Sequence, residues 1–358
     1  MKNRYLCANT LPNTYTMHTF GKHILHLLTA ALLYLTFTAC QPRDRYITIT
    51  GFAQGGTYTV KLNLNGKNGM TDAGPEEIRD SIDAILLRID NTLSGYNRKS
   101  LLSRFNEGDL SYEDCMKDSL FRDIFLKATQ MYNETEGVVD VAAGPLFDLW
   151  GFGFRSGEFP SEEDVMKVRE ACGMNLLLTR KSGELNFNAL AQGYSCDLIA
   201  GYLYSIGIKD MMVNIGEIFC DGLNPSGQPW SLGIDRPVDG NNDPGSDIQG
   251  IFRAPEGPHG IVTSGNYRKF YIKDGKKYAH SVDPRTGYPV SHNLLSATIV
   301  AKDGLTADAY ATYCMVAGLE ESVRLLKERT DLEGCLIYDE NGEFRTWCSD
   351  GFVLESSN

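Results

Sequence analysis

The stretch Ala279–Ala317, AHSVDPRTGYPVSHNLLSATIVAKDGLTADAYATYCMVA, gathers most of the residue types that metal-assisted phosphate chemistry needs. It contains a histidine and the loop sequence VDPRTGYP. In that loop Pro284 fixes φ, and Gly287 accepts backbone angles that residues with a Cβ resist. The sequence therefore predicts a tight, rigid loop that presents Arg285 and Thr286 in defined directions.

The second half of this stretch predicts a strand followed by a helix. LLSATIV is rich in branched side chains, which favours a strand, and LTADAYATYCMVAGLEESVRLLKER is expected to form one helix. Asp308 and Thr312 are four residues apart, so their side chains share one face of that helix. A carboxylate and a hydroxyl placed in this way offer two hard oxygen ligands to one cation, and the same pair also suits a solvated or capping face.

The first 39 residues have the composition of an export signal. They contain no Asp or Glu, carry Lys2, Arg4 and Lys22, and include the apolar run ILHLLTAALLYLTFTA just before Cys40. This run is too short for a comfortable membrane span, and the small residues before the cysteine indicate a lipoprotein processing site. Cleavage without lipidation is the alternative.

Processing at Cys40 divides the chain into three parts. We expect a signal peptide over residues 1–39, a lipidated tether over 40–50 and a folded domain over 51–358, with Met17 as a second candidate start. Lipid on the cysteine sulfur would anchor the protein in the cell envelope. We expect an inner-membrane lipoprotein that faces the periplasm or the extracytoplasmic side.

The charge of the chain argues against nucleic acid as a partner. The formal net charge is -12, and removal of residues 1–39 takes away three positive charges and no negative ones, which gives -15. An acidic protein repels a phosphate backbone. Seven cysteines follow Cys40 without the spacing of a metal site, and in a chain of this size they indicate buried thiols rather than a disulfide framework.

Hydrophobic periodicity and turn residues predict the other elements. Ser100 is expected to cap a helix, and Lys273–Gly275 and Asn341-Gly342 are expected to form hairpin turns. The expected ranges are strands and hairpins at 46–66, 211–222, 229–237, 260–282, 335–340 and 344–349, helices at 75–94, 101–106, 119–135 and 161–173, a strand that leads into a helix at 184–208, and an exposed loop at 238–250.

Three blocks of the chain carry a specific signature. They are TSGNY at Thr263–Tyr267, HSVDPRTGYP at His280–Pro289 and ADAYAT at Ala307–Thr312. In this order and spacing they resemble the C-terminal signature of the ApbE family, whose pattern runs TSG.Y, H.IDP.TGYP and ADA..T. Its members are the FAD:protein FMN transferases once labelled thiamine-biosynthesis lipoproteins.

Further matches extend the resemblance from Gly51 to Leu326. The segment EGVVDVAAGPLFDLWGFG at 136–153 is similar to the family's GAMDITVGPLV.LWGFG, and ELNFNALAQGYSCD at 184–197 is similar to its vDLG.iAKGya.D. The resemblance implies an α+β fold: a single domain with mixed or antiparallel sheets flanked by helices.

The resemblance also implies a flavin site built from separate segments. Gly55 stands where the family has the methionine of Met-Gly-Thr, which removes an apolar wall near the flavin, and Tyr96 matches a tyrosine that lines it. Val138 and Val139 offer backbone and apolar contact to a flat ring, and Asp140 offers a hydrogen bond to the ribityl chain or the ring edge. Alternatively, Tyr96 packs at a helix end and Asp140 caps a helix.

Three more residues fall at cofactor-binding positions of the family. Asn186 stands for the usual Asp and Gln192 for the usual Lys, exchanges that remove one negative and one positive charge but keep hydrogen-bonding capacity. Val282 lies inside the histidine block. We expect cofactor contacts to persist with altered strength. Glu217 stands where the family commonly has a glycine.

A metal site made of hard oxygen ligands is implied as well. The backbone carbonyl of Ala189, the carboxylate of Asp308 and the hydroxyl of Thr312 fall at the family's ligand positions. Such a set suits Mg²⁺ or Ca²⁺ rather than Zn²⁺. Mg²⁺ would bridge the pyrophosphate of FAD and neutralise charge on the AMP side.

His280 is the candidate catalytic base. Of the three histidines after the leader, at 259, 280 and 292, it alone lies in the signature. A lone histidine is usually structural, but its neighbours here favour a role in accepting the proton of an attacking hydroxyl. Arg285 is either a phosphate clamp or a residue that fixes the loop.

Together these residues imply an Mg²⁺-dependent FAD:protein FMN transferase. FAD and a protein threonine hydroxyl would give an FMN-threonine phosphodiester and AMP, with membrane-bound electron-transport subunits or secreted flavoproteins as acceptors. Two alternatives remain open. One is an FAD pyrophosphatase that uses water, and the other is a non-catalytic flavin-binding lipoprotein, made conceivable by the exchanges at Gly55, Asn186 and Gln192.

Overall fold

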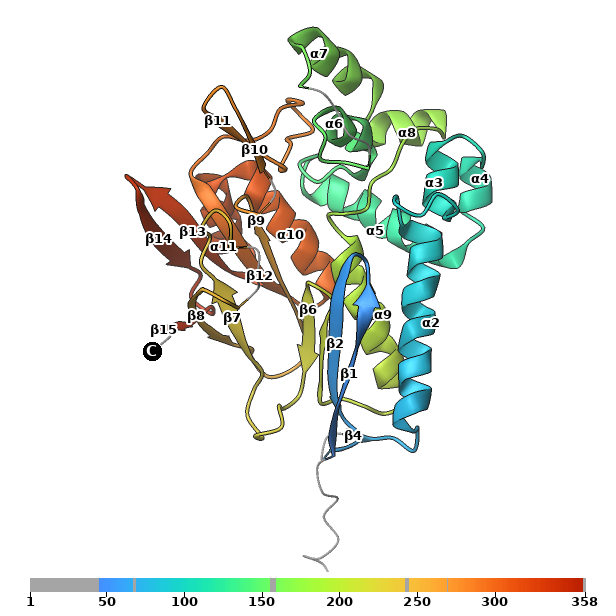
Figure 1. Cartoon of the computed structure of the whole chain (residues 1–358), viewed down its shortest axis with the longest axis vertical. Helices are drawn as coiled ribbons and strands as arrows, with labels where there is room; N and C mark the ends of the chain where they lie inside the picture. The colour runs from blue at the N-terminus through green and yellow to red at the C-terminus, as the bar shows by residue number, and fades with distance from the viewer. Residues whose placement is uncertain (1–44, 67–68, 155–158, 242–244, 269, 357–358) are drawn as a thin grey trace, which may run out of the picture. The chain divides into compact units, whose positions relative to one another are not determined.

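A long antiparallel sheet lies at the centre of the structure. The computed structural model describes residues 45–66, 69–154, 159–241, 245–268 and 270–356. Eight strands hydrogen-bond in the order β1-β2-β5-β6-β9-β12-β13-β14 (Figure 1). Their bounds are β1 Tyr46–Ala53, β2 Gly56–Asn63, β5 Met211–Asn214, β6 Ile218–Asp221, β9 His259–Gly265, β12 Leu294–Ala301, β13 Glu333–Glu340 and β14 Glu343–Cys348.

Three smaller sheets accompany it. They are a three-stranded sheet in the order β15-β8-β7 and the two-stranded pairs β10-β11 and β3-β4. Their bounds are β3 Asn65–Gly66, β4 Gly69–Met70, β7 Ser231–Asp235, β8 Ile248–Arg253, β10 Phe270–Lys273, β11 Lys276–Ala279 and β15 Leu354–Ser356.

Helices occupy about half of the remaining described chain. Their bounds are α2 Pro75–Leu93, α3 Leu101–Asn106, α4 Tyr112–Cys115, α5 Ser119–Glu134, the 3-10 turn η1 Val141–Ala143, α6 Gly144–Leu149, α7 Glu162–Ala171, α8 Met174–Arg180, α9 Ala191–Ser205, α10 Gly304–Ala317 and α11 Leu319–Glu328. The predicted α+β class is confirmed, and every described strand pair in the main sheet is antiparallel.

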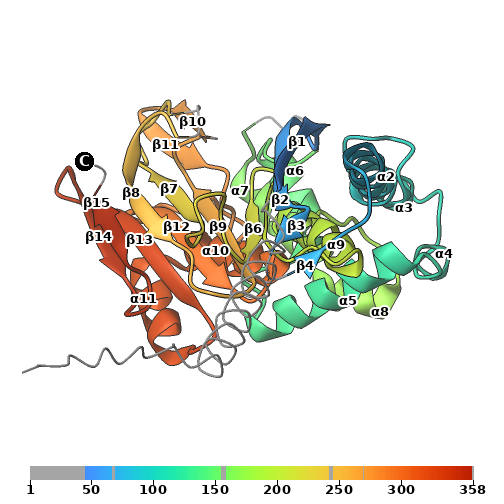
Figure 2. The same ribbon diagram turned by 90° about the horizontal axis from the view of Figure 1, so that it is seen from below.

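The central strands of the main sheet are buried on both faces, and successive residues of each strand point to opposite sides. Ile261 and Ile337 pack with the small sheet that contains β7 and β8. Their neighbours Val262 and Leu336 pack with α10. Figure 2 shows this layering, with β7 and β8 on one side of β9 and β12 and with α10 and α11 on the other. The apolar runs of β12 and β13 follow from burial on both sides.

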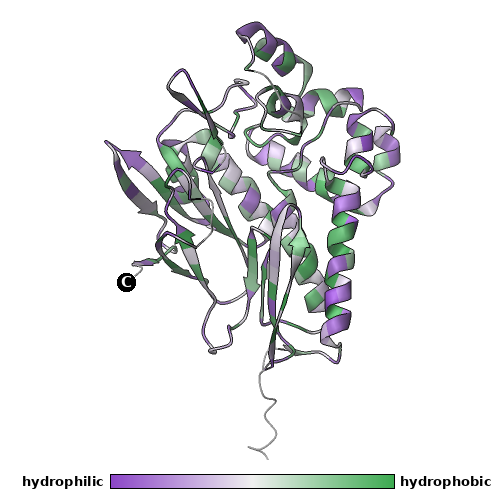
Figure 3. Cartoon of the chain, in the orientation of Figure 1, coloured by the Kyte–Doolittle hydropathy of each residue, from purple (hydrophilic) through white to green (hydrophobic). Residues whose placement is uncertain are grey.

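Helix α2 is the packing helix that its sequence predicts. Ile78, Ile82, Leu86 and Ile89 repeat at helical spacing and are all buried, and the helix begins at Pro75, where a missing N–H costs nothing. Figure 3 shows hydrophilic and hydrophobic residues alternating along α2, as expected for a helix with one polar and one apolar face.

Several predicted caps and turns are confirmed. The Ser103 amide donates to the Ser100 hydroxyl at 2.9 Å, so Ser100 caps α3. Asn341 and Gly342 have φ of 59° and 84°, the left-handed values of a tight hairpin turn between β13 and β14. Asp274 and Gly275 turn β10 into β11 in the same way, with φ of 52° and 76°.

The long helix predicted after Leu305 is wrong in one respect. It ends at Ala317 and a second helix begins at Leu319, because Gly318 has φ of 86° and no longer continues the right-handed helix. The Gly318 amide donates to the Cys314 carbonyl at 2.9 Å and closes the first helix.

Three other ranges are corrected. The predicted tether to Thr50 is too long, since β1 begins at Tyr46 and pairs with β2 along its whole length. The strand predicted from Glu184 does not form, because this extended segment bonds the Asn106 side chain and the Val141 carbonyl instead of a neighbouring strand. The loop predicted to reach residue 250 ends where β8 begins at Ile248.

The contacts group residues 44–358 into one unit. The predicted signal peptide, Met17 and Cys40 lie outside the described residues, and so do residues 41–44 of the predicted tether. Among the helices that the structure describes, none combines the length and the apolarity needed to cross a bilayer.

Candidate functional site

Two helices cross at a pair of glycines and thereby place the predicted metal ligands. A Cβ on Gly193 of α9 would overlap the backbone carbonyl of Gly304, and one on Gly304 of α10 would overlap the carbonyl of Gly193. At this close approach the Gly193 amide donates to Oδ2 of Asp308 at 3.1 Å. Ala189 precedes Gly193 by four residues, just before α9 begins. The crossing therefore brings Asp308 against the first turn of α9.

Asp197 of α9 ties the two helices together one turn further on. Its carboxylate accepts hydrogen bonds from the amides of Gly304 and Leu305, at 2.6 and 2.9 Å, and so binds the first turn of α10. Burial raises the pKa of Asp197 to about 7 in spite of these two amides. The Thr306 amide donates to the side chain of Asp303, which completes the cap of α10.

The electrostatics around Asp308 fit a cation. Only 4% of the residue is exposed, and burial raises the pKa of its carboxyl to about 7, with the charge of Asp197 adding to the effect. A buried carboxylate is costly unless hydrogen bonds or a positive charge compensate it. The Gly193 amide supplies one hydrogen bond, and a divalent cation would supply the charge.

Thr312 lies one turn after Asp308 on α10 and is partly exposed. The predicted set therefore combines one carboxylate, one hydroxyl and one backbone carbonyl, which is oxygen chemistry that suits Mg²⁺. The described residues contain no cluster of three or more His, Cys, Asp or Glu side chains arranged to hold a metal. A hard-cation site at Asp308 would thus rely on neutral oxygen donors for its remaining ligands.

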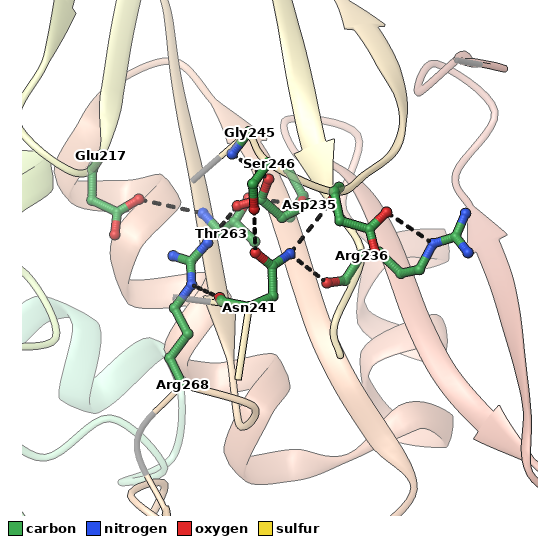
Figure 4. A network of polar contacts seen from close by, with 10 residues as sticks. Glu217, Asp235, Arg236, Asn241, Gly245, Ser246, Thr263 and Arg268 are labelled. Carbon is green, nitrogen blue, oxygen red and sulfur yellow. Dashed lines mark hydrogen bonds and ion pairs between the residues drawn. The ribbon is translucent and has the colours of Figure 1, made fainter. Parts of the chain in front are cut away.

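Glu217 is a residue whose importance the sequence did not reveal. Its Oε2 accepts a hydrogen bond from the Thr263 amide at 3.3 Å (Figure 4). Burial raises its pKa well above the ordinary value, the nearby charge of Asp308 raises it further, and Arg268 opposes both. Arg268 itself forms an ion pair with Asp235. Glu217 thus adds a second acidic group beside Asp308, and its replacement of a glycine was the only signal in the sequence.

The 138–140 segment and Asn186 lie side by side. The Asn186 amide donates to the Val141 carbonyl at 2.7 Å, next to Asp140. Val138 and Val139 are buried side chains in this segment. A flavin would therefore meet their backbone more readily than their side chains.

The carboxylate of Asp140 has backbone partners. Its Oδ1 accepts from the Ala142 amide at 2.8 Å, and its Oδ2 accepts from the Met174 amide at 3.0 Å. The capping alternative for Asp140 is thus confirmed. Burial raises the pKa of this carboxyl, while the two amides lower it.

The β1–β2 turn reaches the same helix as the metal ligands. Gln54 and Gly55 both have positive φ, 52° and 81°, and Nε2 of Gln54 donates to Oγ of Ser195 on α9 at 2.6 Å. Gln192 lies one turn earlier on α9, and its Nε2 donates to the Ile215 carbonyl at 3.0 Å. These contacts bring Gly55 and Gln192 to neighbouring parts of α9.

Tyr96 lies on the surface between α2 and α3. It is 68% exposed, and its ring meets Phe154 edge to face with the centroids 5.1 Å apart. The packing alternative thus has a specific partner, Phe154, which follows the segment LWGFG. The large exposed area also leaves the ring available to a ligand.

The loop that follows His280 is held by hydrogen bonds within its own sequence. The guanidinium of Arg285 donates to both carboxylate oxygens of Asp283, at 3.0 and 2.9 Å, and the Gly287 amide donates to the Asp283 carbonyl at 2.8 Å. Arg285 therefore fixes the loop in this structure. Val282 is buried and forms an isolated bridge with Pro289, so its side chain belongs to the core beneath the loop.

An aromatic cluster joins this loop to the LWGFG segment. Nε1 of Trp150 donates to the Gly287 carbonyl at 2.8 Å, and the His280 ring lies edge-on to Phe152 with the centroids 6.5 Å apart. Tyr271 and Tyr278, opposite each other on β10 and β11, stack on Phe152 and Trp150 respectively. His280 is thus held at the end of β11 against the segment that carries Asp140.

A separate cavity of about 290 Å³ lies behind Asp140. Ala142, Cys172 and Gly173 line it, with Lys167 and Arg180 at its polar side. None of the predicted catalytic, flavin-binding or metal-binding residues lines this cavity. It therefore contributes nothing to the site around Asp308 and His280.

Comparisons with known proteins agree with the signature. A model described as the ApbE family matches residues 55–336. Proteins named FAD:protein FMN transferase from Vibrio cholerae and Escherichia coli K12 are 32% and 31% identical to this chain, covering 91% of it in both cases and 97% and 95% of their own lengths.

Solved structures give the same result. The flavin transferase ApbE from Vibrio cholerae matches with a TM-score of 0.71 at 27% identity, over 87% of this chain and 100% of that one. The flavinyl transferase ApbE of Pseudomonas stutzeri, in its apo form, matches with a TM-score of 0.71 at 29% identity, over 86% of this chain and 95% of that one. The resemblance seen in the three sequence blocks is confirmed, and the chain belongs to the ApbE family.

Proposed function

We propose that this chain transfers FMN from FAD to a threonine hydroxyl of an acceptor protein and releases AMP. Full-length similarity to FAD:protein FMN transferases supports the reaction class. The observation that carries the proposal within this chain is the buried carboxylate of Asp308, held by the amide of Gly193, four residues after Ala189 in the chain. That placement suits a cation which binds the pyrophosphate of FAD.

Asp308, Thr312 and the backbone carbonyl of Ala189 would hold Mg²⁺. When bound, the ion supplies positive charge that offsets the negative charge of the pyrophosphate. The chain's own part is to keep these oxygens in place, which the Gly193–Gly304 contact and the Asp197 hydrogen bonds do. Glu217 is a second buried acidic group at this end of the site, and a bound cation would favour its ionised form.

His280 would accept the proton of the attacking threonine hydroxyl. Its position at the end of β11, between the Phe152 ring and the rigid Asp283–Gly287 loop, limits the directions in which its ring can point. A base in a fixed position contributes about 10²- to 10⁴-fold in rate. The proton would pass from the threonine hydroxyl to the His280 ring. At the same time the threonine oxygen would bond to the phosphorus of the FMN half, and the pyrophosphate bond to AMP would break.

Flavin contacts would come from five segments. Gly55 and Gln192 approach along α9, Asn186 and the 138–140 backbone lie next to each other, and Tyr96 offers an exposed ring. Val282 would act through the backbone of its loop, since its side chain is buried. The carboxylate of Asp140 would keep the 138–140 backbone in place through the hydrogen bonds that it accepts from two backbone amides.

The protein would work in the cell envelope as a lipoprotein anchored through Cys40. The acid-free apolar leader that ends at this cysteine supports the anchor. Its acceptors would be membrane-bound electron-transport subunits or secreted flavoproteins, which share this compartment. An anchor holds the enzyme at the same surface as a membrane-bound acceptor and so raises their encounter rate.

Weighing an acceptor protein tests the proposal directly. The chain from Gln41 onward is incubated with FAD, Mg²⁺ and a threonine-containing candidate acceptor, and the mass of the acceptor and the release of AMP are measured. Transfer predicts slow AMP release from FAD alone, faster release with the acceptor, and a mass gain on the acceptor equal to FMN. Rapid AMP release without any mass gain on acceptors from the same organism would replace the transferase with an FAD pyrophosphatase. Flavin binding with no AMP release would leave a flavin-binding lipoprotein.

A further inference from the structure

Cys335 and Cys348 face each other on neighbouring strands. They are directly opposite in the register of β13 and β14, and in the next pair the Ser349 amide donates to the Gly334 carbonyl at 2.9 Å. Pairs in an antiparallel ladder alternate between hydrogen-bonded and non-hydrogen-bonded. Cys335 and Cys348 therefore form a non-hydrogen-bonded pair, in which Cα atoms are about 4.5 Å apart and the side chains are closest. Disulfides span Cα separations of about 4.4–6.8 Å.

The two thiols already interact. A hydrogen bond between the sulfur atoms raises the pKa of Cys335, with burial adding to the rise, and lowers the pKa of Cys348. Cys335 is 1% exposed, whereas Cys348 is only partly buried. Both pack in the core between the main sheet and the β7–β8 layer. Cys348 is thus the more accessible of the pair.

We propose that Cys335 and Cys348 are a disulfide site, oxidised by thiol–disulfide exchange with a disulfide-bearing partner. The Cys348 thiolate attacks one sulfur of the partner's disulfide and releases the other as a thiolate. Cys335, after losing its proton, attacks the sulfur of Cys348, forms the intramolecular bond and releases the second partner sulfur. Two protons and two electrons leave the protein, and the partner ends as two thiols.

The remaining cysteines of the described chain do not share this arrangement. None of them lies opposite another cysteine in a strand register. Cys220 of β6 packs in the same core as the pair, but Met212 and His259 are its strand partners. The five are Cys115, Cys172, Cys196, Cys220 and Cys314.

The bond would connect the outermost strand of the main sheet to its neighbour. β14 is the last strand in the sheet order and pairs only with β13 among the described strands. A cross-link between the two restricts the unfolded chain and opposes fraying of this edge. This inference depends on the proposed export in one respect: export would bring the protein into a compartment that contains oxidants.

Mass spectrometry after oxidation in solution tests the site. The purified, reduced full chain is incubated with oxidised glutathione, its remaining thiols are alkylated after unfolding, and the peptides are mapped without reductant. The expected result is one cross-linked pair that contains Cys335 and Cys348 and is lighter by two hydrogen atoms. Both thiols alkylated, a lasting glutathione adduct, or a bridge to another cysteine would overturn the proposal.

Matched variants separate this bond from other oxidation. Cys348→Ser should abolish the cross-link, whereas Cys220→Ser, which removes a thiol from the same core, should retain it. Reductant should lower the Tm of the wild type and of Cys220→Ser but leave the Tm of Cys348→Ser unchanged. An equal response of all three proteins to reductant would contradict a structural bridge. Because none of these measurements involves flavin, failure here leaves the proposed transfer reaction untouched.

Discussion

Gly193 and Gly304 touch backbone to backbone where α9 crosses α10, and each occupies the space in which a Cβ on the other would lie. The contact is what allows the Gly193 amide to reach Asp308. Since Asp308 lies on α10 and Ala189 lies two residues before α9 begins, the distance between the helices would set the width of the proposed metal site.

Gly193→Ala should therefore weaken both the fold and the metal site. The added methyl group would force α9 and α10 apart, at a cost of about 1–3 kcal/mol in the free energy of unfolding. The Mg²⁺ concentration for half-maximal AMP release should rise. Gly201→Ala on the same helix is the control, because a Cβ there meets nothing within 4 Å, and it should stabilise the protein by about 0.5–1 kcal/mol. Equal effects of the two variants in urea unfolding would contradict this role of the crossing.

Asp308→Ala should abolish Mg²⁺-dependent AMP release while the protein stays folded. Thr312→Ala should weaken release less, because a neutral hydroxyl compensates less of the ion's charge than a carboxylate does. Mg²⁺ titrations of AMP release, with circular dichroism as the check on folding, measure both effects. An Mg²⁺ dependence in Asp308→Ala that matches the wild type would exclude this metal site.

His280→Asn should depress FMN transfer and FAD hydrolysis together, by about 10²- to 10⁴-fold, since water and threonine need the same base. AMP release with and without acceptor measures both reactions. His259→Asn is the control, because the ring of this histidine is hydrogen-bonded to the Glu256 carbonyl at 3.2 Å and the residue lies outside the signature. Loss of transfer with intact hydrolysis would show that His280 serves acceptor docking instead.

The raised pKa of Asp197 should make the free energy of unfolding depend on pH. Its pKa is raised from 3.8 to about 7 in the folded protein. Between those values the folded state keeps a proton that the unfolded state releases, so the free energy of unfolding falls as pH rises from about 4 to about 7.

Asp197→Asn should remove that contribution. In EDTA, the fall in unfolding free energy between about pH 5 and pH 7 should be about 2 kcal/mol smaller than in the wild type. Asp303→Asn, which alters the neighbouring cap of α10, should retain most of the pH-dependent decrease in unfolding free energy. Urea unfolding at the two pH values measures it, and identical falls in the wild type and Asp197→Asn would refute this assignment.

Cys40→Ser should release the protein from membranes. The leader ends at this cysteine, and a single serine removes the sulfur that would carry the lipid. Fractionation of cells that express the two forms, with mass analysis of the N-terminus, gives the answer. Wild-type protein that stays in the soluble fraction with an unmodified cysteine would rule out the anchor.

Local chemistry made much of the fold predictable. The caps at Ser100 and the turn at Asn341-Gly342 depend on residues a few positions apart, and both appear as expected. Gly318 was harder, because a glycine within an apolar helical pattern is compatible both with one helix and with a break. Only its positive φ, imposed by the packing of α10 and α11, decides between them.

Nonlocal contacts made the rest unpredictable. The segment after Glu184 has the composition of a strand, but no strand lies beside it, and its backbone instead bonds Asn106 and Val141. The positions of Glu217 and Asp197 beside the proposed metal site likewise depend on how α9, α10 and β9 pack. In the sequence Asp197 was visible only as the last residue of the similar segment at 184–197, and Glu217 only as a replacement for glycine.

The hydrogen bond from Trp150 to Gly287 has an optical consequence. It holds one of the chain's three indoles, 4% exposed, against the loop that begins at His280. Flavins absorb light at the wavelengths where buried indoles emit, so a flavin bound near His280 would quench the emission of Trp150 by energy transfer. The protein therefore carries its own fluorescent reporter of cofactor occupancy, and Trp150→Phe would identify its share of the signal without any attached dye.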